Sequence, residues 1–230
     1  KKSIAAISSF IVEGNLRFND FGVHLRGVDP SQVVLVDFSM PKEVFKKFEV
    51  EPMLVGVDLV EFNKILSRVQ PGETLLLDLG EAELKLTVVG EFEKNFSLPL
   101  IESSSEDVTV PKIKFDSSVE ISARVLKEVL KDASVFASLV VFSVKKNSFV
   151  VEARGSGGTM SGVSKDAKSV KVESTHDVTA KFSLTFLQNI VREVDLTEKV
   201  LLELKSDSPA KVTFAIGKNR FEFYLANMIL

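Results

Sequence analysis

The stretch VDLVEFNKILSRVQPGETLLLDL, residues 57–79, returns later in the chain as FSLTFLQNIVREVDLTEKVLLEL, residues 182–204, at a constant offset of 125 residues. In each copy, apolar residues first recur at helical spacing and then alternate as in a strand, after a turn at Pro71-Gly72 or at Asp195. The matched pairs are Leu59 with Leu184, Ile65 with Ile190, Leu66 with Val191, Val69 with Val194, Glu73 with Glu198, Leu76 with Leu201 and Leu77 with Leu202. The chain is therefore predicted to consist of two halves built on one plan.

A second correspondence, between residues 14–27 and residues 142–155, predicts one β-hairpin in each half. Each hairpin follows a segment with helical periodicity, residues 3–11 in the first half and residues 122–136 in the second. The expected buried faces are formed by Ile4, Ile7 and Ile11 in the first segment, and by either Val125, Val129 and Ala133 or Leu126 and Leu130 in the second. We thus expect the order helix, strands, helix, strands twice over.

Alternation of apolar and polar residues predicts further strands, most clearly at residues 82–90, 210–217 and 220–226. One face of such strands meets helices and the other meets a neighbour or water. The expected fold class is therefore α+β, with antiparallel sheets and helices on one side.

The two halves are separated by ESSSEDVTVP, residues 102–111, a Ser-rich and acidic stretch that has the composition of an exposed linker. We place a first domain at residues 1–101, a connector at residues 102–112 and a second domain at residues 113–230. Because the sequence starts at Lys1 rather than Met, inside the first predicted helix, we expect the start of the first domain to be truncated.

The composition excludes several classes of protein. With no Cys, the chain has no disulfides, thiolate zinc sites or cysteine nucleophile. No apolar run approaches the roughly 18 residues of a membrane span, and no signal peptide is recognisable, so we expect an intracellular protein without a membrane partner. The net charge of -3 means that any contact with nucleic acid must come from a local basic face.

Candidates for catalysis are few. His24 and His176, the only histidines, fall in different halves, so we expect structural histidines and no metal site. The string RGSGGTMSG, residues 154–162, lacks the spacing of a phosphate loop or a nucleophile elbow and is predicted to be a flexible turn between strands. No cofactor is expected.

Two pairs of carboxylates have a spacing that would place both members on one face of a strand: Glu81 with Glu83, and Glu91 with Glu93. We interpret them as solvated strand faces. The alternative is a two-domain enzyme whose site uses unremarkable carboxylates such as Asp58 or Glu61. That alternative predicts a pocket containing acids with perturbed pKa values.

Basic residues fall on all four predicted helices. Taken one helix at a time, they are also what an ordinary amphipathic helix carries on its solvent face. Taken together, in a chain whose strands and linker carry much of the acid, they predict a basic layer that grips phosphates without reading base sequence. The residues are Lys1, Lys2, Lys64, Arg68, Lys127, Lys131 and Arg192.

Several segments together resemble the sliding clamps of the proliferating cell nuclear antigen family, and the resemblance covers essentially the whole chain. The segments are FGVHLRGVDPSQVVLVDF at 21–38, VGVDLVEFNKIL at 55–66, VTVP at 108–111, SDSPAKVTF at 206–214 and RFEFYLA at 220–226. The resemblance implies two similar domains of the DNA-clamp fold in each subunit. It also implies three subunits closed head to tail into a ring, with sheets outside and two helices per domain lining the hole.

The resemblance further implies two sites. DNA contact is carried onto Lys1, Lys2, Lys64, Lys131 and Arg192, whereas Arg68 and Lys127 rest on helix position alone. A partner pocket under the connector receives a short peptide with one aliphatic and two aromatic anchors. The matching pocket positions are Val28, Gln32, Val33, Val108, Val110, Pro209, Tyr224, Ala226, Asn227 and Ile229.

The implied function is that of a non-catalytic processivity factor, which encircles double-stranded DNA and tethers DNA polymerase, flap endonuclease and DNA ligase. A clamp loader and two further subunits, identical or different, are implied partners, and a checkpoint-type clamp is an alternative with the same fold. Four positions depart from the family pattern, which suits a specialised subunit of an archaeal heterotrimeric clamp: Ser8, Ser67, Glu128 and Asn227. The expected location is the cytoplasm, at the nucleoid, or the nucleus in a eukaryote.

Overall fold

The computed structural model of the chain describes residues 1–102, 108–145, 148–164 and 168–229. The described helices are α1 (Lys2–Ser8), η1 (Lys42–Val44, a 3-10 turn), α2 (Leu59–Ser67), α3 (Ala123–Ala133) and α4 (Leu184–Val191). The strands of the first half are β1 (Glu13–Asn19), β2 (Gly22–Val28), β3 (Val34–Pro41), β4 (Met53–Asp58), β5 (Thr74–Leu79), β6 (Glu83–Val89) and β7 (Lys94–Pro99). The strands of the second half are β8 (Ser117–Ser122), β9 (Leu139–Lys145), β10 (Ser148–Gly155), β11 (Gly158–Val163), β12 (Val170–Ser174), β13 (Val178–Ser183), β14 (Lys199–Leu204), β15 (Ala210–Ile216) and β16 (Asn219–Leu225).

One long sheet runs through both halves of the molecule. Its nine strands have the order β12-β8-β14-β15-β16-β3-β2-β1-β4. The link between the halves is the antiparallel pairing of β16 with β3, from Arg220 opposite Ser39 to Leu225 opposite Val34. The other strands form a four-stranded sheet, β11-β10-β9-β13, and a three-stranded sheet, β5-β6-β7. All named strand pairs in the described residues are antiparallel, which confirms the predicted fold class.

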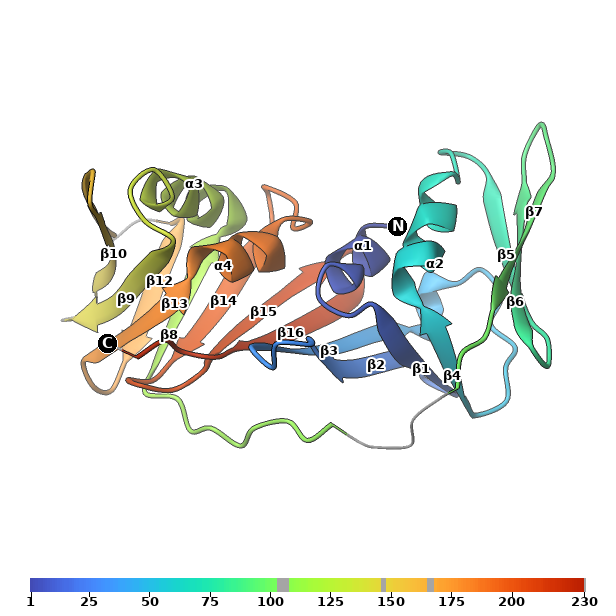
Figure 1. The fold of residues 1–230 in the computed structure, drawn as a ribbon, viewed down its shortest axis with the longest axis horizontal. Coiled ribbons are helices and arrows are strands. Elements are labelled where there is room, and N and C mark those ends of the chain that lie inside the picture. The colour runs from blue at the N-terminus through green and yellow to red at the C-terminus, as the bar shows by residue number, and fades with distance from the viewer. Residues whose placement is uncertain (103–107, 146–147, 165–167, 230) are drawn as a thin grey trace.

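The four helices lie on the same side of the long sheet, α1 beside α2 and α3 beside α4 (Figure 1). Each helix buries one apolar face because its apolar residues recur at helical spacing. In α3 Leu126 and Leu130 are fully buried, as is Ala133 from the other predicted face, whereas Val125 and Val129 are only partly covered. Of the two faces that the periodicity allowed for this segment, packing selects the leucine face.

Aromatic packing joins the two halves. The ring of Phe10, after α1, lies 6.3 Å from the ring of Phe186 on α4 and 5.5 Å from the ring of Phe223 on β16. Nearby, the buried amide of Asn219 donates to the hydroxyl of Ser3 at 2.7 Å. The hydrophobic core is therefore continuous across the halves.

The repeat in the sequence corresponds to a repeat in structure. Residues 57–79 contain the end of β4, α2 and β5, and residues 182–204 contain the end of β13, α4 and β14. In the first copy, the carboxylate of Asp58 caps α2 by accepting from the amide of Glu61 at 2.8 Å. The two predicted hairpins are also confirmed, as β1-β2 and β9-β10.

Several sequence-based boundaries were wrong. The predicted helices at 3–11 and 122–136 end earlier, at Ser8 and Ala133, because the chain turns sharply there to enter the next strand. Most of the predicted turn at 154–162 is strand β11, and only Ser156 and Gly157 separate it from β10. A glycine with φ of +155° at position 158 lets the second strand start at once beside the ring of Phe136.

The carboxylate pairs do not share strand faces. Glu81 precedes β6, and Glu91 and Glu93 lie between β6 and β7, so only Glu83 is on a strand. The hydroxyl of Ser97 on β7 donates to the Glu83 carboxylate. Alternation was a misleading signal here because the chain reverses direction between Val89 and Lys94.

The predicted connector, residues 102–112, falls partly outside the described residues, since residues 103–107 are not among them. The chain leaves the first half after Ile101, whose amide donates to the carbonyl of Gly56 at 3.0 Å. It joins the second half at Asp116, whose amide donates to the carbonyl of Leu204 at 3.1 Å. The proposed domain boundaries remain predictions.

Candidate DNA-facing surface and partner pocket

The helix layer exposes most of the predicted DNA-contacting cations to solvent. Six of the seven are exposed, namely Lys1, Lys2, Lys64, Arg68, Lys131 and Arg192. They come from all four helices or the residues that end them, which places them on the side of the sheet that carries the helices (Figure 1). The structure thus brings together on one face the residues that the sequence predicted separately.

Carboxylates of the same chain neutralise part of this charge. Lys64 donates to Glu61, one turn earlier on α2, at 2.5 Å, and this hydrogen bond raises the pKa of Lys64. Lys2 pairs with Asp195, which follows α4, so this ion pair crosses between the two halves. Pairs this exposed add little to stability, but they lower the net charge available to a phosphate.

The remaining exposed cations differ in their partners. Arg192 pairs with its neighbour Glu193 at 3.2 Å, and the ammonium of Lys1 donates to the carbonyl of Ser67 at 3.2 Å. Within the described part of the chain, Arg68 and Lys131 make no ion pair. These two side chains therefore have the most charge to offer a phosphate backbone.

Lys127 is placed differently from the other cations. Its ammonium donates to the carbonyls of Arg192 and Val194, at 2.9 and 2.6 Å, just beyond α4. Burial lowers the pKa of Lys127. This geometry favours a structural role that ties α3 to the end of α4, and contact between Lys127 and DNA stays a prediction.

The floor of the predicted partner pocket is a row of apolar side chains across three strands, on the face opposite the helices. Val28 on β2 lies directly opposite Leu35 on β3, and Leu35 lies directly opposite Tyr224 on β16. Directly opposite residues of an antiparallel pair project to the same face. Leu35 and Tyr224 are only 8% and 7% exposed, whereas Val28 is 38% exposed, so the Val28 end of the row is the part most open to an apolar group.

The loop beside this row is held rigid by Asp29. Its carboxylate accepts from the amides of Ser31, Val33 and Val34 at 3.0, 2.7 and 2.5 Å, and also from the Ser31 hydroxyl. Burial by itself would raise the pKa of Asp29, but these hydrogen bonds outweigh it and hold the pKa below its usual value. The arrangement keeps Gln32 in the left-handed region, with φ of +58°, and directs the Val33 carbonyl to the amide of Ala226 at 2.9 Å.

The other predicted pocket residues lie in the connector, just before β15 and near the C-terminus. Val108, Val110 and Pro209 are half-buried, and Ile229 is 93% exposed. The C-terminal segment runs beside β13, where the amide of Met228 donates to the carbonyl of Lys181 at 2.8 Å. The structure thus brings Val28, Val33, Tyr224 and Ala226 together. The role of each residue in peptide binding stays a prediction.

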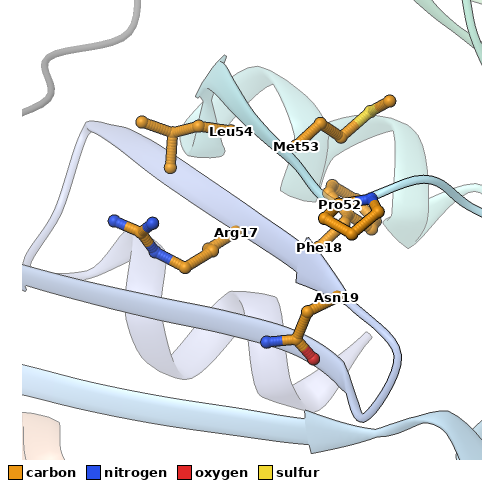
Figure 2. Close-up of a pocket in the computed structure, with 6 residues that line it drawn as sticks. All are labelled: Arg17, Phe18, Asn19, Pro52, Met53 and Leu54. Carbon is orange, nitrogen blue, oxygen red and sulfur yellow. The ribbon is translucent and has the colours of Figure 1, made fainter.

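The structure contains two cavities that lie away from this row. The larger, about 330 Å³, lies at the ends of β1 and β4 and is drawn in Figure 2; it is lined by Arg17, Phe18, Asn19, Pro52, Met53 and Leu54. The smaller, about 210 Å³, lies between α3 and α4 and is lined by Lys127, Leu130, Gln188, Val191 and Arg192. Neither contains a carboxylate, so neither resembles the acid-lined pocket that the enzyme alternative predicts.

The carboxylates named for the enzyme alternative have structural partners. Asp58 caps α2, and Glu61 pairs with Lys64. His24 pairs with Asp37 on the long sheet, whereas His176 lies after β12 in the other half. Among the described residues, no group of three or more His, Asp or Glu side chains is placed to hold a metal ion, and no helix is long and apolar enough to cross a membrane.

Sequence reasoning missed three residues near the pocket. Leu35 completes the apolar row, and Arg26 and Asp37 form an ion pair at 2.6 Å beside it. Arg26 and Val28 are two residues apart on β2, which indicates that their side chains project to the same face. Their partners on β3 could not be found in this way, because they depend on strand register.

Two family models match the chain, one in each half. The family model for the proliferating cell nuclear antigen N-terminal domain matches residues 1–110, and that for the C-terminal domain matches residues 109–229. DNA polymerase sliding clamp 1 of Thermococcus kodakarensis is 30% identical over 228 residues, 97% of this chain and 92% of that protein. The DNA polymerase sliding clamp of Nitrosopumilus maritimus is 29% identical over 231 residues, 98% of this chain and 93% of that protein.

Solved structures show the same fold. The crystal structure of PCNA from Thermococcus kodakaraensis superposes with a TM-score of 0.92 at 24% identity, over 99% of this chain and 95% of that one. The crystal structure of proliferating cellular nuclear antigen from Entamoeba histolytica superposes with a TM-score of 0.90 at 22% identity, over 99% of this chain and 94% of that one. Because the two domain models together span residues 1–229, the chain belongs to the proliferating cell nuclear antigen family.

Proposed function

We propose that the chain is one subunit of a ring-shaped DNA sliding clamp, which serves as a processivity factor for DNA polymerase. The observation that carries this proposal is the helix layer: four helices with exposed cations on one side of a sheet that runs through both halves. Such a surface suits the lining of a hole around DNA, because cations bind phosphates without reading base sequence. Relatives of nearly the same length are named DNA polymerase sliding clamps, which supports the assignment.

Two strand edges that pair with no further strand among the described residues, one at each end of the molecule, support closure into a ring. Strand β7 ends the three-stranded sheet and β11 ends the four-stranded sheet, and in Figure 1 these sheets lie at opposite ends. Exposed apolar residues accompany both edges, with Phe92 78% exposed before β7 and Val163 61% exposed at the end of β11. An uncovered edge invites pairing with another chain, and two different edges give head-to-tail contacts that can close. We therefore propose that β7 of one subunit pairs with β11 of the next.

The mechanism of such a ring is topological. A closed ring cannot leave DNA sideways, so a weakly bound enzyme stays at high effective concentration near its substrate. The proposed partners are DNA polymerase, flap endonuclease and DNA ligase, held through the pocket on the outer face, and a clamp loader that opens the ring. In this role the chain catalyses no reaction itself. It acts on the chromosomal DNA.

The test is the mass of the purified chain in solution, measured by light scattering alone and with the other clamp subunits of the same source. A trimer alone establishes three identical subunits, and a monomer that becomes a trimer only with its paralogues establishes a heterotrimer. A monomer or dimer under every condition contradicts the proposal.

Loading on DNA gives a second, independent readout. An assembled ring that encloses DNA should stay on a closed circular plasmid through a high-salt wash and slide off the same plasmid after linearisation. Equal retention on both forms would show ordinary binding rather than encirclement. The comparison uses one protein and one sequence, so the topology of the DNA is the only difference.

A further inference from the structure

Arg26 connects three parts of the outer face of the molecule. From β2, its Nε and Nη2 donate to Oδ2 of Asp37 on β3 at 2.9 and 2.6 Å. Its Nη1 donates to the carbonyl oxygen of Val108, in the connector, at 3.4 Å. Because the donors of a guanidinium have a fixed planar arrangement, the two bonds to Asp37 set the direction of the third.

The carboxylate that directs Arg26 is itself held in place. The other oxygen of Asp37, Oδ1, lies 2.6 Å from Nε2 of His24, and the side chain is only 18% exposed. Burial alone would raise the pKa of Asp37, but hydrogen bonds from His24 and Arg26 outweigh it and lower the pKa. Glu222, directly opposite Asp37 on β16, has cations of its own in Arg220 and Lys211. The Asp37 carboxylate therefore stays ionised and available to Arg26 at neutral pH.

The described part of the connector has few other hydrogen bonds to the long sheet. It is fixed at one end by the bond of Ile101 to Gly56 and at the other by the bond of Asp116 to Leu204. Among the described residues between these points, 102 and 108–115, the bond from Arg26 to Val108 is the one hydrogen bond to the long sheet. Its loss would leave this part of the connector without a polar attachment.

The attachment point adjoins the apolar row of the pocket. Arg26 and Val28 are two residues apart on β2 and so project to the same face. Val108, which Arg26 holds, and Val110 are both half-buried. The hydrogen bond thus sets the position of one wall of the pocket relative to its floor.

We propose that Arg26, braced by Asp37 and His24, is a positioning residue for the partner peptide, because it holds the connector at Val108 over the Val28-Leu35-Tyr224 row. This inference rests on the proposed function, in which a peptide binds under the connector. Without the attachment the connector spends less time in the position that binds peptide. The apparent dissociation constant then rises in proportion to the lost population.

The test is binding of a synthetic peptide with one aliphatic and two aromatic anchors to the assembled ring, followed by fluorescence anisotropy. Arg26→Met keeps the aliphatic stem and removes the donors. We expect its dissociation constant to be about five- to tenfold higher, as for the loss of one hydrogen bond of ordinary strength, because the bond to Val108 is long and exposed. Arg26→Lys should not restore affinity, because a single ammonium cannot replace the planar fork.

Two further variants separate positioning from general disturbance. Arg220→Met removes a similar pair on the same face, in which Nε and Nη2 donate to Glu222 at 3.0 and 2.6 Å, but Arg220 makes no bond to the described part of the connector. It should bind peptide like the unmodified protein. The double variant Arg26→Met with Asp37→Asn removes the charge of the carboxylate that has lost its bonds from Arg26, and it should bind as weakly as Arg26→Met alone.

Each outcome has a distinct meaning. If the unmodified ring does not bind the peptide, the inference falls together with its premise, the partner pocket. If the unmodified ring binds and Arg26→Met binds equally well, the pocket stands and the role of Arg26 is refuted. If the double variant regains full affinity, the weak binding came from the Asp37 charge without Arg26 beside it, and the role of Arg26 is again refuted.

Discussion

Replacing Lys127 by Met is expected to destabilise the fold and to change DNA binding less than the loss of an exposed lysine does. The Lys127 ammonium bonds to the carbonyls of Arg192 and Val194, at 2.9 and 2.6 Å, immediately after α4 ends at Val191. Carbonyls at a helix C-terminus have no following turn to bond to, and a cation there is stabilised by the helix dipole. Methionine keeps most of the apolar stem of the lysine and removes its donors.

The magnitude follows from the two hydrogen bonds. A hydrogen bond to a charged group contributes about 1.5–3 kcal/mol in a buried setting, but Lys127 is only half-buried. After a discount for solvent screening, we expect a loss of about 2 kcal/mol for the pair. In a chain of this size such a loss lowers the melting temperature by roughly 4–8 °C.

The measurement is a calorimetric melt, together with the salt dependence of binding to a linear duplex. The matched control is Lys131→Met, one turn later on the same helix, where the lysine is exposed and has no ion pair within the described residues. The control should leave the melting temperature unchanged and reduce the slope of log K against log salt by about 0.9 for each phosphate that is no longer neutralised. If Lys127→Met instead kept the melting temperature and reduced the slope, the structural role argued for Lys127 would be refuted.

Three other substitutions test the junction, the loop and the ring. Phe10→Ala should lower the free energy of unfolding by about 3–5 kcal/mol, because Phe10 is 5% exposed and its ring packs against both halves. Urea unfolding measures this free energy, and a decrease under about 1 kcal/mol would contradict a shared core. Asp29→Asn should cost about 1–3 kcal/mol at pH 6, since one accepting oxygen is removed. The hydrogen bonds outweigh burial and lower the pKa of Asp29 in the folded protein below its usual value of 3.8. The ionised carboxylate therefore stabilises the fold fully above pH 3.8, and this contribution is lost as the pH falls through the lowered pKa. The difference in free energy of unfolding between Asp29→Asn and the unmodified protein should accordingly shrink at about pH 3. Val163→Asp should prevent trimer formation in light scattering while circular dichroism stays unchanged, because Val163 is 61% exposed and the change puts a charge on the β11 edge. A trimer of normal stability would rule out this edge.

Much of the fold could be predicted because its signals are local. The offset of 125 residues, the helical spacing and the strand alternation each involve residues close together in the chain or a simple repeat of them. These signals correctly gave two similar halves, antiparallel strands and the positions of the four helices. They were weakest at element ends, where a helix such as 122–136 stopped early because the chain had to turn into β9.

The sites were predicted less completely. Helix position identified Arg68 and Lys131 as exposed cations, and the structure places them on the helix side. The same reasoning treated Lys127 as equivalent to them, although its ammonium is occupied by backbone carbonyls. Periodicity specifies which face a side chain occupies, but it does not specify which groups from other elements share that face.

The sequence by itself determined the local elements, the two-fold repeat and the sides on which apolar and charged residues lie, because these depend on backbone geometry over a few residues. The tertiary structure alone decided the pairing of β3 with β16, which makes one sheet of two halves. It also decided the hydrogen bonds of Arg26 with Val108, 82 residues away, and of Lys2 with Asp195, 193 residues away. Such pairings depend on strand register and on the packing of distant elements, which no local pattern encodes.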